Sequence, residues 1–162
     1  MSQRQRLTTV RVRLALAAIA CPLALTCGGC NDSPVSSDQS QLQAAMNLLG
    51  LQYGGYVSEH QGAGPPNKAS LRSFLQARLP LLQDFGVAGV DDLLPNGRDG
   101  APIQVIYGKP LQVADRPQYV WVAYEASAPT GSRLACDSRG GVYELSEEDF
   151  ANQIGERLLP SG

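Results

Sequence analysis

Few side chains in this sequence could carry out catalysis. Its single histidine is His60, and its four cysteines lie at positions 21, 27, 30 and 136. A hydrolytic triad or a cysteine–histidine dyad would need His60 as the base, with Cys136 or a serine as the nucleophile. No Gly-x-Ser-x-Gly nucleophile elbow is present. A histidine at a helix end beside glycines is typical of a cap for the last carbonyls, and Cys136 fits a small buried residue. We therefore expect no catalytic residue, so that the protein is not an enzyme.

Metal and cofactor sites are not indicated either. One histidine and one cysteine outside the first 30 residues cannot complete a structural zinc site. Asp91, Asp92 and Asp99 lie near glycines but lack the spacing of a calcium-binding loop. A later group of acids fits the start of a helix and a solvated face: Glu144, Glu147, Glu148 and Asp149. We predict no metal ligand and no cofactor.

The first 29 residues have the pattern of an export signal. Arginines at positions 4, 6, 11 and 13 precede an apolar run over residues 14–25, and Gly28 and Gly29 follow it. Positive charge, an apolar run and small residues, in that order, are typical of a secretory signal peptide. The apolar run is too short for a membrane-spanning helix of about 20 residues. We therefore predict that residues 1–29 direct export and are removed.

Small residues directly before a cysteine resemble the lipobox of bacterial lipoproteins, in which the cysteine is acylated, for example with palmitate, and becomes the mature amino terminus. Cys30 follows two glycines and is the predicted attachment site. Cys21 follows Ala18-Ile19-Ala20 but would leave only seven apolar residues upstream, and Cys27 follows a threonine. The alternative is an ordinary cleaved signal with a soluble product. The resemblance implies a protein anchored to a bacterial membrane by an amino-terminal lipid.

Charge and composition limit the partners of the exported part. All 15 acidic residues but only nine of the 13 basic ones lie in residues 30–162, which gives this part a net charge of −6. Such an acidic surface argues against nucleic acid and against anionic lipid as partners. Residues 30–41 are polar and rich in serine and predict a flexible tether. The remainder, residues 42–162, is the size of a single domain.

A long helix is predicted over residues 40–60. Apolar residues recur there at helical spacing and form one stripe, which consists of Leu42, Met46, Leu49, Tyr53 and Tyr56, widened by Ala45 and Leu48. Glycines at positions 50, 54 and 55 would each weaken the helix by up to ~1 kcal/mol relative to alanine. We therefore expect a close contact or a kink at these glycines, and we favour packing of the stripe on the protein's own sheet over contact with other subunits.

The second half of the chain predicts strands. A short helix over residues 70–79 and an irregular segment over 81–94 precede strands at 102–107 and 118–126. In the second strand Trp121 should share a face with Tyr119 and Ala123, opposite Val120, Val122 and Tyr124, and should be the most buried aromatic residue. A hairpin joins 133–136 to 141–145, and Ser146 should cap a terminal helix. The predicted fold is α+β: a long helix, short helices, a three- or four-stranded antiparallel sheet and a terminal helix.

The segment from Asn47 to Tyr56, followed by His60 and Pro65-Pro66, resembles the pilin-like secreted proteins of planctomycetes. The later order, from Asp99-Gly100 through Tyr124-Glu125 to an acidic helix start, is similar too. The resemblance implies a pilin-derived domain without an established activity. The sequence therefore predicts an envelope lipoprotein with a non-catalytic interaction or structural domain. The alternatives are a minor component of a pilin-related secretion or filament apparatus, with envelope or pilin-like partners, and a small hydrolase or ligand-binding domain.

Overall fold

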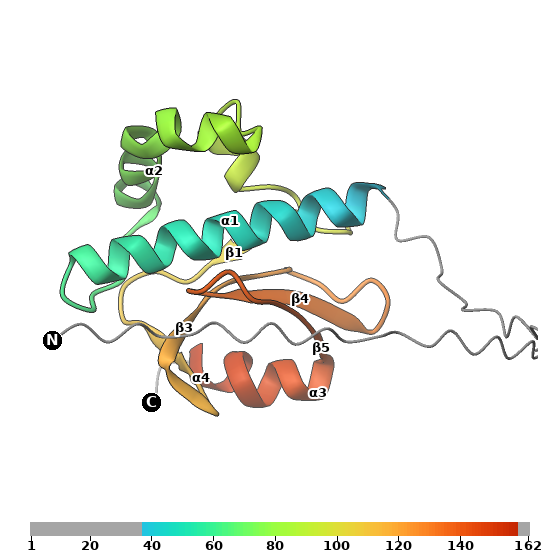
Figure 1. The fold of residues 1–162 in the computed structure, drawn as a ribbon. Coiled ribbons are helices and arrows are strands. Elements are labelled where there is room, and N and C mark those ends of the chain that lie inside the picture. Colours follow the sequence, from blue (N-terminus) through green and yellow to red (C-terminus); the bar gives the residue numbers. More distant parts are fainter. Residues whose placement is uncertain (1–36, 159–162) are drawn as a thin grey trace, which may run out of the picture. The chain divides into compact units, whose positions relative to one another are not determined.

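The computed structural model describes residues 37–158, which belong to one compact unit (Figure 1). Residues 1–36 and 159–162 lie outside the described part. The predicted signal peptide, the attachment site at Cys30 and most of the predicted tether over residues 30–41 are therefore outside it as well. Within the described part the chain is α+β, with helices packed on a small antiparallel sheet.

The first helix, α1 (Ser37–Glu59), lies across one face of the sheet (Figure 1). It begins three residues before the expected start, so residues 37–41 are helical and not part of a flexible tether. Its apolar stripe is buried, and most of it packs in one cluster with residues of the sheet, which confirms the packing that we favoured; these stripe residues are Leu42, Met46, Leu49 and Tyr53. The fifth stripe residue, Tyr56, is buried against Phe74 of the next helix. The expected helix over residues 40–60 is thereby confirmed.

Two of the helix glycines allow a close approach between α1 and a turn of the sheet. A Cβ atom at Gly50 would meet the carbonyl oxygen of Asp137, and one at Gly54 would meet the carbonyl oxygen of Ser138. Both separations would be well inside 3.0 Å, which real Cβ atoms essentially never show. The expected close contact is confirmed at these two positions. At Gly55 the nearest atom is the terminal nitrogen of the Arg78 side chain, at 3.3 Å.

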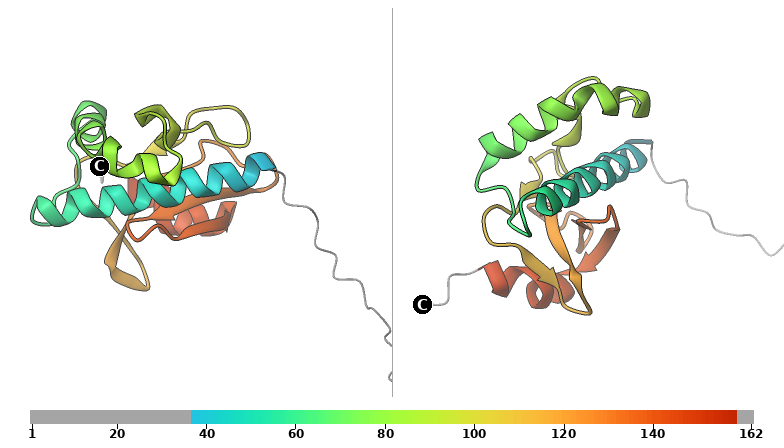
Figure 2. Two further views of the ribbon diagram at one scale, coloured as in Figure 1. Left: turned by 45° about the horizontal axis from the view of Figure 1, so that its top comes forward. Right: turned by 60° about the vertical axis from the view of Figure 1, so that its left-hand side comes forward.

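The second helix, α2 (Lys68–Leu82), lies on the far side of α1 from the strands (Figure 2). Asn67 caps its start, because the side-chain oxygen of Asn67 (Oδ1) accepts a hydrogen bond from the Ser70 N–H at 2.9 Å. Two short 3₁₀ helices follow, η1 (Gln83–Phe85) and η2 (Val90–Leu93), where the sequence indicated an irregular segment. The predicted helix over residues 70–79 is thus extended at both ends.

The sheet has five antiparallel strands. They are β1 (Gln104–Val105), β2 (Leu111–Val113), β3 (Arg116–Tyr124), β4 (Ser132–Asp137) and β5 (Val142–Ser146). The order is β1-β3-β4-β5, and β2 also pairs with β3. The hairpin of β4 and β5 was predicted, whereas β2 was not. The predicted strand over residues 102–107 has only two residues in ladder pairing.

Apolar residues pack on both faces of the sheet in two clusters. One lies under α1 and α2, and the other includes Trp121, Ile154 and Leu145 beside the terminal helices α3 (Glu147–Phe150), η3 (Ala151–Gly155, a π-helical turn) and α4 (Glu156–Leu158). The predicted capping of the terminal helix is confirmed, because Ser146 Oγ accepts the Asp149 N–H at 3.1 Å.

The predicted faces of β3 are partly wrong. The register between β3 and β4 shifts between Trp121 and Ala123. Val122 and Ala123 therefore both pack in the cluster under α1, while Tyr124 packs with Trp121 in the other cluster. A β-bulge breaks strict alternation in this way because it places two residues opposite one on the partner strand. The α+β class with a small antiparallel sheet is confirmed, and the pilin-like description stays a prediction.

Candidate interaction site

His60 caps the end of α1. Its Nδ1 lies 2.8 Å from the Tyr56 carbonyl oxygen, to which it donates a hydrogen bond. The imidazole also stacks on the Tyr56 ring, with centroids 3.8 Å apart and planes 3° from parallel. These contacts confirm the capping role that the sequence predicted for this histidine.

Cys136 is a buried residue of the core. It lies in β4 with no exposed surface, as a free thiol. Burial raises the pKa of the thiol to about 12, because the thiolate would lose its hydration inside the apolar cluster. The thiol therefore remains protonated at neutral pH, and the prediction of a small buried residue is confirmed.

The acids that the sequence singled out serve separate local contacts. Asp91 accepts a bond from Arg72 at 2.6 Å, Asp92 caps η2, and Asp99 accepts the Ala101 N–H at 2.9 Å. Within residues 37–158 no three His, Cys, Asp or Glu side chains are grouped so that they could hold a metal ion. The helices of this described part are also too short or too polar to cross a membrane.

A buried ion pair between Arg98 and Glu125 was not expected from the sequence. The Arg98 guanidinium donates to both Glu125 oxygens, at 3.1, 3.0 and 2.7 Å, and the Arg98 backbone N–H donates to Glu125 Oε1 at 2.7 Å. Glu144, placed by the sequence with the acids of a helix start, lies in β5 and accepts a bond from Arg98 at 2.9 Å. The pair fixes the loop around residue 98 to the sheet. The only sequence signal was a glutamate directly after an apolar strand.

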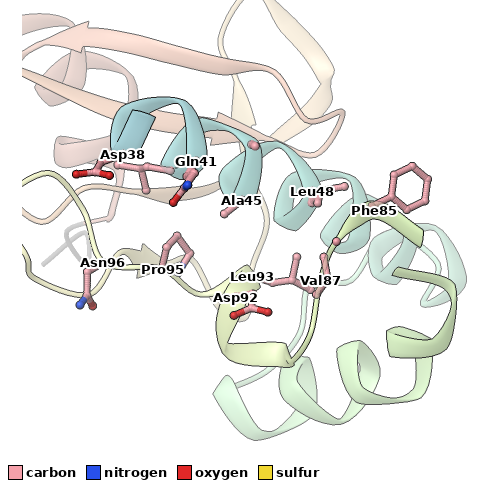
Figure 3. Close-up of a pocket in the computed structure, with 13 residues that line it drawn as sticks. Asp38, Gln41, Ala45, Leu48, Phe85, Val87, Asp92, Leu93, Pro95 and Asn96 are labelled. Atoms are coloured by element: carbon pink, nitrogen blue, oxygen red, sulfur yellow. The ribbon is translucent and has the colours of Figure 1, made fainter. Parts of the chain in front are cut away.

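A groove of about 510 Å³ runs beside the first half of α1, between this helix and the segment from Phe85 to Asn96 (Figure 3). Most of its lining is apolar. The lining residues on α1 are Asp38, Gln41, Leu42, Ala44, Ala45 and Leu48, and those on the facing segment are Phe85, Gly86, Val87, Asp92, Leu93, Pro95 and Asn96.

Local turn chemistry shapes the facing wall of this α1 groove. Gly86 ends η1 in the left-handed region, with φ of 80°, which reverses the chain between the exposed Phe85 and the buried Val87. The Asp92 carboxylate then accepts the N–H groups of Ala88 and Gly89 at 2.8 and 2.9 Å. These bonds hold the wall without using a side chain from α1.

The α1 groove and its rim expose apolar surface next to negative charge. Phe85, which lines the groove, is 70% exposed, and Ala44 on α1 is exposed as well. The charged side chains that line the groove are Asp38 and Asp92. Such a surface can bury apolar side chains of a partner and attract a cation. The sequence signal for it was the widening of the stripe of α1 by Ala45 and Leu48.

Comparisons with known proteins add no relationship. No protein family matches the chain, and neither a curated protein nor a solved structure shows significant similarity to it.

Proposed function

We propose that the chain is a membrane-anchored envelope lipoprotein whose domain binds another protein. The observation that carries the binding role is the α1 groove, which combines an apolar lining with the largely exposed apolar side chain of Phe85. Exposed apolar surface that lines a groove is typical of protein contacts. The anchor rests on the lipobox-like sequence that ends at Cys30.

The partner proposed for the α1 groove is a protein segment with apolar side chains flanked by lysine or arginine. Apolar groups of such a segment would replace water over Ala44, Leu48 and Phe85. Its cations would face the carboxylates of Asp38 and Asp92, and the acidic charge of residues 30–162 would favour their approach.

Metabolic labelling with an alkyne fatty acid in a bacterial host tests the anchor. We expect the full-length chain to be labelled and to sediment with membranes, and Cys30→Ala to lose both properties. Cys21→Ala and Cys27→Ala serve as matched controls and should keep them. Labelling that persists in Cys30→Ala would show that this cysteine is not the attachment site.

A charge introduced into the α1 groove tests the binding role. The probe is a fluorescent amphipathic peptide of lysine and leucine, and the readout is its anisotropy on titration with the full-length protein. Ala44→Lys should weaken binding about tenfold, because it adds a cation to the groove. Leu51→Lys adds the same charge to a 46% exposed position of the same helix outside the groove and should change binding less than about twofold. Equal losses in both variants would show attraction to overall charge without a groove site.

A second candidate is a minor component of a pilin-related apparatus. Its support is the order of elements in the described part, a long helix on a small antiparallel sheet, together with the resemblance of residues 41–154. Because the apolar stripe of α1 is buried in the protein's own core, contacts between subunits would need another face of the helix. A photo-crosslinker at the exposed Leu51 should then give ladders of this chain; crosslinks within single chains alone would exclude assembly through that face.

A further inference from the structure

A second hollow lies between the loop that precedes β2 and the terminal helix α4. Its volume is about 570 Å³. Its lining residues are Ile106, Tyr107, Lys109, Pro110, Leu111, Gln112, Arg157 and Leu158. The Tyr53 hydroxyl on α1 donates to the Ile106 carbonyl at 2.8 Å, which places this hollow toward the end of α1 opposite Ser37. It shares no lining residue with the α1 groove.

The cations at this second hollow differ from most others in the described part. Five arginines there lie within 4.0 Å of a carboxylate: Arg72, Arg78, Arg98, Arg116 and Arg133. Lys109 and Arg157 have no such partner among the described side chains, yet both line the same hollow. In a protein with an excess of acids, two cations that have no carboxylate partner among the described side chains form a local positive site at this concavity.

The donors at the second hollow are partly fixed in place. Arg157 Nη1 donates to the Gln112 carbonyl at 2.8 Å, which holds the guanidinium beside β2 and leaves its other N–H groups for a ligand. Tyr107 also lines this hollow and is half-buried, with its side chain packed against the apolar cluster under α1 and α2. The apolar surface at the site comes mainly from Leu158, which is 38% exposed, because Ile106 and Leu111 behind it are only 5% and 9% exposed.

We propose that the second hollow binds an oxyanion, a carboxylate or a phosphate, carried on a compact apolar group. An arginine fork matches the two oxygens of such an anion, and a nearby lysine adds a mobile positive charge. The volume lies within the range of small-molecule sites, and the apolar surface would cover the uncharged part of the ligand. This binding activity is independent of the lipid anchor and of the α1 groove.

Calorimetric titration of the full-length protein, held in nanodiscs of zwitterionic lipid, tests the site with four probes. Phenyl phosphate and benzoate carry the two anion types on an apolar ring, phenol lacks the charge, and inorganic phosphate lacks the ring. We expect at least one ring-bearing anion to bind more tightly than phenol and inorganic phosphate, and its affinity to fall as salt is added. The stronger of the two anions identifies the ligand as a phosphate ester or a carboxylic acid.

Three variants and a control variant assign the binding to the proposed side chains. Lys109→Gln, on an exposed loop, and Arg157→Gln should each weaken binding about tenfold, because each removes one charge-assisted contact. Arg157→Lys keeps the charge and should bind with intermediate affinity even if the fork is lost. Arg139→Gln removes a cation that contacts Tyr119 elsewhere and should have less than about a twofold effect. Absence of binding by both ring-bearing anions, or equal losses in Lys109→Gln and Arg139→Gln, would overturn the proposal.

Discussion

Two carboxylates of the described residues lie inside the fold, and backbone N–H groups hold both of them, in Glu125 together with an ion pair to Arg98. Glu125 and Asp137 are each 1% exposed. Glu125 accepts N–H groups from Arg98 and Leu134 in addition to its ion pair. Asp137 accepts the Arg139 and Gly141 N–H groups at 2.8 and 3.0 Å and the Tyr143 hydroxyl at 2.9 Å. Because a buried charge without partners is costly, these acids lock the loop at residue 98 and the β4–β5 turn in place.

Substitution of Trp121 tests how much the packing of a single core residue contributes to stability. It is 1% exposed, stacks edge-on against Tyr143, and its indole N–H has no partner among the described residues. Trp121→Ala should cost about 3–5 kcal/mol of unfolding free energy, a large part of the 5–15 kcal/mol typical of a domain. Denaturant unfolding followed by circular dichroism measures this loss.

The control for this prediction is Trp121→Phe, which keeps an aromatic ring in the site and removes the unpaired donor together with part of the ring volume, so it should cost less than Trp121→Ala. The wild-type emission of this single tryptophan should be blue-shifted and should move to the red on unfolding. Native emission at the wavelength of free tryptophan would contradict the burial of β3 on both faces.

The Cys136 thiol predicts a pH dependence of stability. Its pKa is about 12 in the folded protein against an ordinary value of 9.0. A raised folded-state pKa means that the unfolded chain loses its proton first as pH rises. The contribution of this thiol to the unfolding free energy is therefore fully present below pH 9. Above pH 9 it declines by up to about 1.4 kcal/mol per pH unit.

Urea titrations of unfolding between pH 7 and 10 would measure the decline in stability. The unfolding free energy of each protein is compared with its own value at pH 7. By this measure Cys136→Ala should lose less unfolding free energy than the wild type between pH 9 and 10. An identical decline in both proteins would show that the thiol is not its source.

At the scale of the elements, the sequence predicted those that local patterns define. The helical spacing of Leu42 to Tyr56 gave α1, and the dense apolar and aromatic run around Trp121 gave β3. The three residues of β2 were missed because they pair only through the register of β3, which no local pattern encodes. The α1 groove was missed for the same reason, because Phe85 and Ala44 come together only through tertiary packing. The one indication in the sequence was the width of the apolar stripe of α1, which offers more apolar surface than the core buries.

The helix glycines give a matched test of how α1 meets the β4–β5 turn. Gly54→Ala improves helix propensity but places a Cβ atom against the Ser138 carbonyl, so it should destabilise the fold by about 1–3 kcal/mol. Gly55→Ala gains the same propensity and meets only the flexible end of Arg78, so it should be neutral or stabilise by up to ~1 kcal/mol. Chemical denaturation of both variants decides the point, and a stabilising Gly54→Ala would show that the helix does not approach the turn so closely.

At the scale of the whole described unit, the sheet separates two apolar clusters that have different covers. Helices α1 and α2 cover one face, and the terminal helices from Glu147 to Leu158 cover the other (Figures 1 and 2). The strand β3 contributes residues to both clusters, Val122 to one and Trp121 to the other. Loss of packing on either face therefore weakens the same central strand, so the two clusters should unfold together.

Because the two clusters share β3, we predict one cooperative unfolding transition, with the same midpoint when it is followed by two probes that report different clusters. Far-UV circular dichroism is weighted toward the long helix α1, while Trp121 fluorescence reports the cluster under the terminal helices. Leu49→Ala on α1 and Ile154→Ala in η3, each removing a side chain with 0% exposure, should lower stability by about 2–5 kcal/mol with both probes moving together. Leu81→Ala, at a position that is 71% exposed, should change the unfolding free energy by less than about 0.5 kcal/mol. Separate midpoints for the two probes in Ile154→Ala would mean that the terminal helices detach first, and that the sheet holds together through the α1 face alone.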